Sequence, residues 1–485
     1  MVAASPTALY RPPGAFDRTT ALLPYAGAWS ERHAAHALRR AGFGGTPDEV
    51  VRLASLGTHA AIDSLVRFVD TSAMPNGPTL SSNAFVFGMR PDREMIKAHR
   101  MQERRDILAL TQWWLERMIA TPAPLQEKMT LFLHGHFTTA AIQKNVSPLE
   151  VGVQNDLFRR HALGNFHDLT LAIAQDPAML KYLDNARSNR AHPNENFARE
   201  LMELYTLGIG NYSEQDVRES ARAFTGYQVR RDQGFVFNRR DHDDGPKTFL
   251  GQSGNFDGSD IVNIIFQQPA AATFLATKLI EFFVYSEPEP EFVAAFADVI
   301  RRNRFELQPS LATLLRSNVF FSDRAYRALV KSPVEFVVGA HRTFGIASVD
   351  AGTEGALRRM GQILFYPPNV KGWDGGAAWL NSETLLTREN FASALTANPK
   401  MMDAPWLTGG GSAMKMNAMD PRAMARRLTD AILLGDVSPA SMARLVSYLG
   451  GSDQTALAML SGENFDERVR GGAYLTMAMP AYQLN

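Results

Sequence analysis

SEQDVRESARAFTG, residues 213–226, and YQVRRDQGFVF, residues 227–237, carry the two signals from which the fold class follows. In the first stretch, Ser213 with Asp216 three residues later resembles a capping box, and Gly226 supplies a helix stop. In the second, apolar and polar residues alternate on both sides of Asp232-Gln233-Gly234, a pattern that is typical of a β-hairpin. The sequence therefore predicts a helix that is followed directly by a small hairpin.

The helix signals recur along most of the chain. Thr46-Pro47-Asp48-Glu49, for example, offers a capping residue, then proline at the first helical position, then acids in the first turn. Periodic apolar stretches predict further helices at about 93–120, 124–140, 146–162, 166–175, 194–207, 258–285, 289–303, 308–318, 331–345 and 384–396. We therefore expect a mainly α protein, a large multi-helical bundle-like body with one small β-hairpin insertion near 227–250.

The distribution of proline, glycine and small residues divides this body from its ends. Prolines at positions 6, 12 and 13 favour an extended N-terminal arm over residues 1–29. Residues 30–399 form the main helical body, and the Met- and Gly-rich stretch 400–419 reads as a flexible linker. Residues 420–485 are then expected to form a C-terminal helical region that packs on the body.

Composition excludes several classes of function. The 485 residues include no cysteine, which rules out disulfides, thiol catalysis, Cys-ligated zinc and iron–sulfur clusters. Fifty basic residues balance fifty acidic ones, so we expect no nucleic-acid partner. No apolar run is long enough for a membrane span. Residues 1–28 lack the basic start and apolar run of an export signal, which predicts a cytoplasmic protein.

The histidines in LFLHGHF, residues 131–137, are the first candidates for chemistry. A helical wheel places His136 on the apolar face and His134 on the polar face, so one metal cannot take both from a regular helix. An interior His136 must find partners for its ring nitrogens, either in a purely structural network or in a catalytic or metal site. Gly135 weakens the helix, which indicates close approach by another segment.

A polar arc on the helix near 194–207 holds the second candidates. Glu200 and Glu203 lie about 60° apart on the wheel, so they can converge on one point. The arc is also what an ordinary surface helix presents, with spaced Glu–Arg ion pairs. If it faces a cleft instead, the two glutamates supply acid–base groups or ligand oxygens, and His136 is their expected partner.

Two loops complete the set. Asp241-His242-Asp243-Asp244-Gly245 is an acidic turn next to Lys247, and its spacing does not match a calcium loop. His242 and Lys247 either build this turn or contribute to a site. Asn369-Val370-Lys371-Gly372-Trp373-Asp374-Gly375-Gly376 is a rigid loop with a cation and a large aromatic, of a kind that builds binding sites as often as it fills cores.

Several of these segments resemble the bacterial domain of unknown function 1800 family. The resemblance rests on ordered blocks that cover the chain from about 30 to 478: ALRRAGFGGT (37–46), LFLHGHF (131–137), MLKYLDNARS (179–188), HPNENFARELMELYTLGIGNYSEQDVRESARAFTG (192–226), HDDGPKTFLG (242–251) and PPNVKGWDGG (367–376). The family usually has Trp-His-Asn-His where this chain has Leu133-His134-Gly135-His136. The resemblance implies a sulfatase-like partner protein and, for many members, export to the periplasm.

Two functions from different classes fit these features. In the first, His136, Glu200, Glu203, His242 and Lys247 gather around one cleft and form an enzyme site, with a divalent metal as a candidate cofactor. In the second, the protein is a non-catalytic helical scaffold that holds a sulfatase-like or other partner, which would explain why no known catalytic motif is present.

Overall fold

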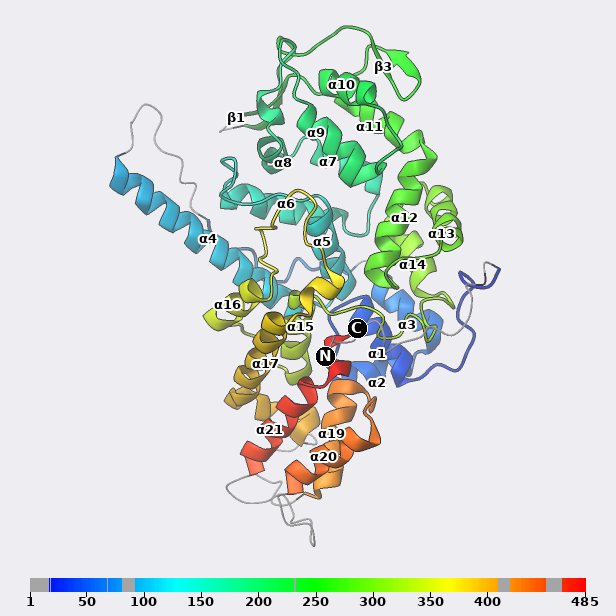
Figure 1. Cartoon of the computed structure of the whole chain (residues 1–485), viewed down its shortest axis with the longest axis vertical. Helices are drawn as coiled ribbons and strands as arrows, with labels where there is room; N and C mark the ends of the chain where they lie inside the picture. The colour runs from blue at the N-terminus through cyan, green and yellow to red at the C-terminus, as the bar shows by residue number, and fades with distance from the viewer. Residues whose placement is uncertain are drawn as a thin grey trace.

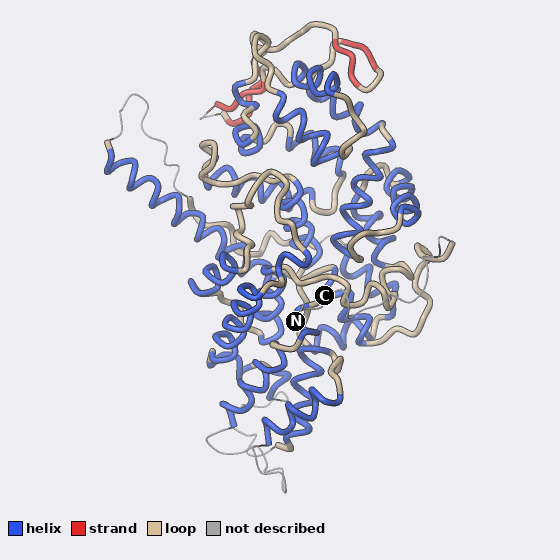
Figure 2. Tube along the Cα trace, viewed as in Figure 1, coloured by secondary structure: helices blue, strands red, loops and turns tan. Residues whose placement is uncertain are grey.

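A computed structural model shows an elongated helical molecule, in which the two β-hairpins lie at one end and the C-terminal helices at the other (Figures 1 and 2). The structure describes residues 17, 19–67, 69–80, 92–230, 233–408, 419–450 and 465–485. Helix α4, residues Arg93–Ala120, runs outward from the middle of the molecule. Within the described residues, no helix combines the length and the apolar character needed to cross a bilayer.

The helices before the first hairpin build the middle of the molecule and part of the hairpin end, where α10 lies beside β3 (Lys247–Phe249; Figure 1). In chain order they are α1 (Glu31–Arg40), α2 (Pro47–Ala54), α3 (Gly57–Val66), α4, α5 (Pro124–His136), α6 (Pro148–His161), α7 (Phe166–Ile173), α8 (Pro177–Tyr182), η2 (Asn185–Arg187), α9 (Glu195–Glu200), η3 (Leu201–Thr206) and α10 (Glu214–Ala223).

After the hairpins the chain returns to the middle and then forms the opposite end. These elements are α11 (Gly258–Gln267), α12 (Pro269–Phe283), α13 (Pro290–Arg302), α14 (Leu307–Leu315), α15 (Pro333–Phe344), α16 (Ala351–Arg359), η4 (Gly376–Trp379), α17 (Ser382–Ala397), η5 (Pro399–Asp403), α18 (Pro405–Thr408), α19 (Pro421–Leu433), α20 (Pro439–Gly450), α21 (Phe465–Met477) and η8 (Pro480–Gln483).

The β structure consists of two separate antiparallel pairs. Strand β1 (Tyr227–Arg230) pairs with β2 (Gly234–Phe237), in a register that sets Tyr227 opposite Phe237. Strand β3 (Lys247–Phe249) pairs with β4 (Gln252–Gly254). The mainly α fold with a small hairpin is thus confirmed. The second pair was not predicted, because strands of three residues are too short to show an alternating pattern.

The predicted helix signals are present as hydrogen bonds. Thr46 accepts from the Glu49 amide at 3.2 Å, and the Glu49 carboxylate accepts from the Thr46 amide at 2.8 Å. Ser213 forms the same reciprocal box with Asp216 at the start of α10. Such boxes satisfy amide groups that the first helical turn leaves without partners.

Gly226 ends the turn after α10 in a left-handed conformation, with φ at +81°. A Cβ atom there would lie 2.6 Å from the Asn238 carbonyl oxygen and 3.2 Å from the His242 backbone nitrogen. Gly208 has a similar φ of +80° just past η3. Gly226 therefore has the left-handed conformation that is typical of a helix stop, and Gly208 shares it.

The predicted division into an arm, a body, a linker and a C-terminal region stays a prediction. Part of the predicted linker is helical, because η5 and α18 lie within it. Residues 409–418 of the linker and residues 1–16 and 18 of the arm lie outside the described residues. A single apolar core runs through the described helices, and its fully buried side chains include Trp114, Phe137 and Tyr205.

Candidate functional site

The C-terminal end of α5 holds two buried histidines, and both are bonded to main-chain groups. His136 donates from Nε2 to the Tyr205 carbonyl at 2.9 Å. His134 accepts at Nε2 from the Phe365 amide at 3.0 Å. Burial lowers the pKa of His136 to about 4 and that of His134 to about 3, so both rings are neutral at pH 7. The expectation that His134 is on a polar face was wrong, because α5 is covered on that side as well.

The segment that covers this side is the loop 366–376, which passes beside α5 and α6 (yellow in Figure 1). Its Gly372 approaches so closely that a Cβ atom would lie 2.5 Å from the Gly135 carbonyl oxygen. The neighbouring Trp373 ring lies 5.5 Å from the His134 ring, measured between centroids. The close approach that Gly135 suggested is therefore present, and it fixes the base of the loop against α5.

The backbone that His136 contacts belongs to η3, a π-helix that continues directly from α9. The Leu207 amide donates to the carbonyl of Met202, five residues earlier, at 2.8 Å. Single π-turns within helices are rare and are frequent at functional sites. Glu200 is the last residue of α9 and Glu203 lies within η3, so the wider turn lies where the two candidate glutamates are.

Glu200 and Glu203 have different surroundings. Glu200 is half-buried, and its pKa is raised by burial and by the charge of Glu203, while Arg199 and Lys371 act in the opposite direction. Lys371 belongs to the loop that packs on α5, and within the described residues its charge acts on the Glu200 carboxyl without an ion pair between them. Glu203 accepts a hydrogen bond from the Tyr212 hydroxyl at 2.8 Å. Burial and this bond raise the pKa of Tyr212 to about 12, so its hydroxyl keeps its proton.

The charge of Glu200 acts on two buried tyrosines, Tyr182 and Tyr205. Burial raises the pKa of Tyr182, and the charges of Tyr366 and Glu200 add to the effect. Burial also raises the pKa of Tyr205, again with a contribution from Glu200. We name Glu200, Glu203, Lys371, Tyr182 and Tyr212 the glutamate site. Its members come from α8, η3 and its flanks, and the 366–376 loop, three segments that are distant in sequence.

His242 and Lys247 are bonded elsewhere. His242 is buried, and its Nδ1 donates to the Thr225 carbonyl at 2.9 Å. Lys247 is buried and donates to the carbonyl oxygens of Asp243, at 2.5 Å, and Gly245, at 3.0 Å. These bonds hold the turn between the two hairpins against the end of α10. Among the described residues, no hydrogen bond or ion pair of His242 or Lys247 reaches the glutamate site.

A divalent metal, which was one candidate cofactor, does not suit these donors. The one ring nitrogen of His136 with a polar contact is committed to a carbonyl oxygen, and a neutral imidazole that donates from Nε2 cannot ligate through that atom. Across the part of the chain that the structure describes, no three His, Asp or Glu side chains are grouped so that they could hold a metal ion. We therefore derive no chemistry through a metal at this site.

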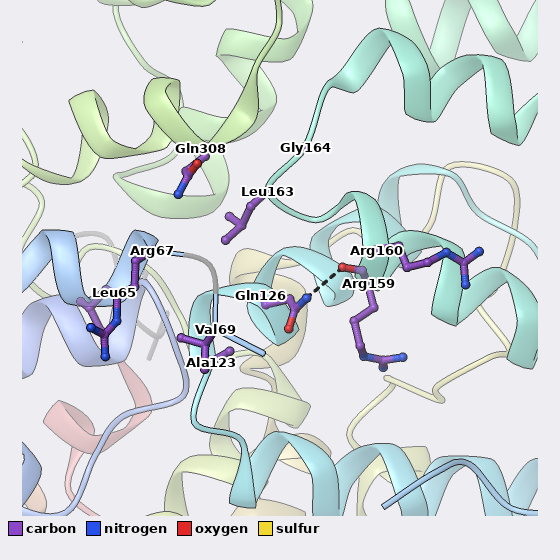
Figure 3. Close-up of a pocket in the computed structure, with 10 residues that line it drawn as sticks. All are labelled: Leu65, Arg67, Val69, Ala123, Gln126, Arg159, Arg160, Leu163, Gly164 and Gln308. Atoms are coloured by element: carbon purple, nitrogen blue, oxygen red, sulfur yellow. Dashed lines mark hydrogen bonds between the residues drawn. The ribbon is translucent and has the colours of Figure 1, made fainter. Parts of the chain in front are cut away.

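Two cavities of the described structure lie apart from the glutamate site. One, of about 170 Å³, is lined by residues of the middle region: Leu65, Arg67, Val69, Ala123, Gln126, Arg159, Arg160, Leu163, Gly164 and Gln308. In Figure 3 the Arg159 and Arg160 side chains point away from the cavity, and Gln126 donates to the Arg159 carbonyl at 3.2 Å. The Arg159 guanidinium binds the buried Glu127 instead. No reactive set converges there.

Sequence reasoning anticipated part of this arrangement. The two glutamates were placed on one arc, and the loop with Lys371 was recognised as a candidate site builder. Tyr182 and Tyr212 were missed, because a lone tyrosine in a helical or turn segment carries no signal of its own. The π-turn was also missed, because no residue pattern in the sequence marks it.

Comparison with known proteins identifies the family of this chain but no individual relative. Residues 36–484 match the model of a family described as "Protein of unknown function (DUF1800)". The chain matches no curated protein and no solved structure.

Proposed function

Because the chain belongs to the protein family of unknown function DUF1800, a membership that fixes no reaction, we propose a function from the geometry of the glutamate site alone. We propose that the protein is an enzyme in which Glu200 and Glu203 transfer protons to and from a polar substrate. The observation that carries the proposal is the position of the half-buried Glu200 at the start of a π-turn, in which Glu203 accepts a hydrogen bond from the Tyr212 hydroxyl.

The two glutamates are suited to opposite roles. Burial and the neighbouring charge raise the pKa of Glu200, which favours the protonated form that a general acid requires. Glu203 has its carboxylate oriented by the Tyr212 hydroxyl, which suits a general base. Pairs of carboxylates whose environments differ in this way recur in acid–base enzymes. Lys371 supplies a cation that can stabilise negative charge on the reacting group.

His136 acts in this proposal as a positioning residue. Its hydrogen bond to the Tyr205 carbonyl joins the end of α5 to the π-turn that carries Glu203. The contact of Gly372 with Gly135 places Lys371 against the same end of α5. His242 and Lys247 remain predicted site residues. Their bonds to nearby carbonyls suggest that they stabilise the turn between the two hairpins.

The test is an activity screen with matched variants. Purified protein is assayed against chromogenic carboxylate esters, phosphate esters, sulfate esters and glycosides. Any activity found should fall by about 100-fold or more in Glu200→Gln and in Glu203→Gln, the range that removal of an acid–base group produces. Glu195→Gln is the control, because Glu195 lies on the same α9 but pairs with Arg199 at 3.4 Å on the surface. Activity that survives both glutamate substitutions would exclude this site.

A second function is supported by a different observation. His136, His242 and Lys247 all bond to main-chain carbonyls, which is typical of structural residues. This supports a non-catalytic scaffold that binds a sulfatase-like partner. If that function is correct, the partner co-purifies equally with the wild type and with Glu200→Gln, and no substrate class is turned over. Turnover of a substrate class that is lost in Glu200→Gln would favour the enzyme over the scaffold.

A further inference from the structure

A group of buried and partly buried cations lies where the C-terminal segment returns to the middle of the molecule. Figure 1 shows this red segment near α1 and α15, and Val330 and Leu484 form an antiparallel bridge there. The cations come from three separate parts of the chain. We name them the cation cluster: Arg39 at the end of α1, Arg327 and Lys331 before α15, and Arg388 in α17.

Main-chain contacts tie the members of the cation cluster together. Arg388 donates to the Lys331 carbonyl at 2.7 Å and to the Gln483 side chain at 3.3 Å. The Lys331 amide donates to the Gln483 carbonyl at 2.9 Å. Arg327 donates to the carbonyl of Ala481, in the same C-terminal segment. Arg39 and Arg327 share the ring of Tyr326, because each guanidinium carbon lies 5.7 Å from the ring centre. After burial, the charges of Arg39, Arg327 and Arg388 lower the pKa of Lys331, and the charge of Glu335 acts in the opposite direction.

Several donors in this cluster have no acceptor. Lys331 is 7% exposed, its Nζ lies 3.7 Å from the centre of the Tyr482 ring, and no hydrogen-bond acceptor contacts this Nζ within the described residues. Arg388 is fully buried, and its Nε has no partner. On Arg39, both Nε and one terminal nitrogen are buried without a hydrogen bond. Buried donors without partners are rare in native proteins, where a water molecule or an ion usually satisfies them.

The nearby carboxylates do not balance these cations. Glu335 is paired with Lys128 and also caps the Ser332 amide at 2.6 Å. Asp436 accepts from the Tyr326 hydroxyl and lies 3.2 Å from the Arg327 Nε. Lys331, Arg39 and Arg388 form no ion pair with either carboxylate within the described residues. Several unpaired cations in one buried place cost free energy unless a negative charge joins them.

We propose that the cation cluster binds one small inorganic oxyanion, such as phosphate or sulfate, as a structural ligand. The Nε edge of Arg39 leaves two parallel N–H donors free, and such a fork binds two oxygens of one oxyanion. Lys331 and the Arg388 Nε supply the further donors that a tetrahedral anion can accept. Bound by these side chains, the anion would be part of the fold and separate from the substrate of the glutamate site.

The experiment measures binding of inorganic phosphate to the full chain in HEPES buffer at constant ionic strength. Equilibrium dialysis of the wild type should give saturable binding of one phosphate per chain, and the melting midpoint should rise along the same curve. Lys331→Met and Arg39→Met should each bind about tenfold more weakly or not at all. Lys400→Met, which removes an exposed lysine outside the cluster, should bind as the wild type does.

Two further measurements, the melting temperature of Lys331→Met and phosphate binding by the wild type, test the proposal even if a variant does not fold. In phosphate-free buffer Lys331→Met should melt at a higher temperature than the wild type, because it removes an uncompensated buried charge. If a variant does not fold, dialysis of the wild type with phosphate, and then with sulfate as competitor, still decides the question. Absence of saturable binding to the wild type overturns the proposal. Equal binding by Lys331→Met and the wild type overturns it as well.

Discussion

The ring of His136 donates its Nε2 hydrogen to the main-chain carbonyl of Tyr205, across 2.9 Å, and so joins α5 to the end of η3. The last carbonyls of a helix lack partners within the helix, and a buried one must be satisfied by another group. His136, which was expected to face Glu200 and Glu203, therefore binds a main-chain carbonyl of the π-turn that carries Glu203.

Replacement of His136 should reveal this role through pH. Its pKa is lowered to about 4 in the folded state, against a usual value near 6.5. The stability it contributes is therefore present above about pH 6.5 and is lost as the pH falls toward about 4. His136→Gln should remove about 3 kcal/mol of this acid destabilisation. Urea unfolding at intervals from pH 4 to pH 7 measures it. A variant with the same pH profile as the wild type would contradict the prediction.

The turn after α10 gives a prediction with an internal control. Gly226 and Gly251 share a positive φ, +81° and +80°, but a Cβ atom at Gly226 meets the Asn238 carbonyl oxygen at 2.6 Å whereas one at Gly251 meets nothing within 4 Å. Gly251→Ala should lower the free energy of unfolding by about 1 kcal/mol, the cost of the left-handed backbone alone. Gly226→Ala should cost about 2 kcal/mol more, since the backbone must shift. Equal melting midpoints for the two variants would show that the close contact is absent.

The helices and their ends were predictable because each depends on a few neighbouring residues. Thr46 with Glu49 and Ser213 with Asp216 form their capping boxes from side chains three positions apart, a spacing that is visible in the sequence. Glu200 and Glu203 are also three positions apart, so their position on one face of the helix could be predicted in the same way.

The contacts of the site were not predictable, because they join distant segments through the backbone. The acceptor for His136 is a carbonyl, which every residue has, so no residue type marks it. The helical wheel also gave the wrong environment for His134, because it assumes that the polar face of a helix is exposed. In α5 the polar face is buried too, and Glu127 and Lys128 form ion pairs there. Charged residues that pair inside a protein look like surface residues in a sequence.

The two glycines at the contact between α5 and the 366–376 loop should respond in opposite ways. At Gly135 a Cβ atom would lie 3.8 Å from the Trp373 ring, an ordinary contact, so Gly135→Ala should raise the free energy of unfolding by up to about 1 kcal/mol through helix propensity. At Gly372 a Cβ atom would lie 2.5 Å from the Gly135 carbonyl oxygen, with φ at +84°.

Gly372→Ala should therefore move the loop and Lys371 with it. We expect a loss of about 2 kcal/mol in the free energy of unfolding, together with loss of any activity that depends on Glu200. Thermal melting and the substrate screen measure the two effects. If Gly372→Ala left both unchanged, the loop would not be fixed on α5 as described.

A last prediction concerns Asp176, the N-cap of α8, whose side chain accepts from the Met179 amide at 2.8 Å and from the Gln154 side chain at 2.6 Å. Burial raises its pKa from 3.8 to about 7, and the charge of Glu150 adds to the effect. The folded state therefore holds a proton that the unfolded state releases near pH 4. The resulting stability is complete below about pH 3.8 and is lost as the pH rises through about 7.

Asp176→Asn keeps an oxygen for the cap and removes the titration. The wild type should lose up to about 4 kcal/mol of stability between pH 4 and pH 8 through this group, and the variant should not. Urea midpoints over this range measure the difference. Asp350→Asn is the control, because Asp350 caps α16 through the Thr353 amide at 2.9 Å but is exposed. Parallel pH profiles for the wild type and Asp176→Asn would mean that Asp176 is already ionised in the folded protein, and that its burial is compensated by a cation or by water.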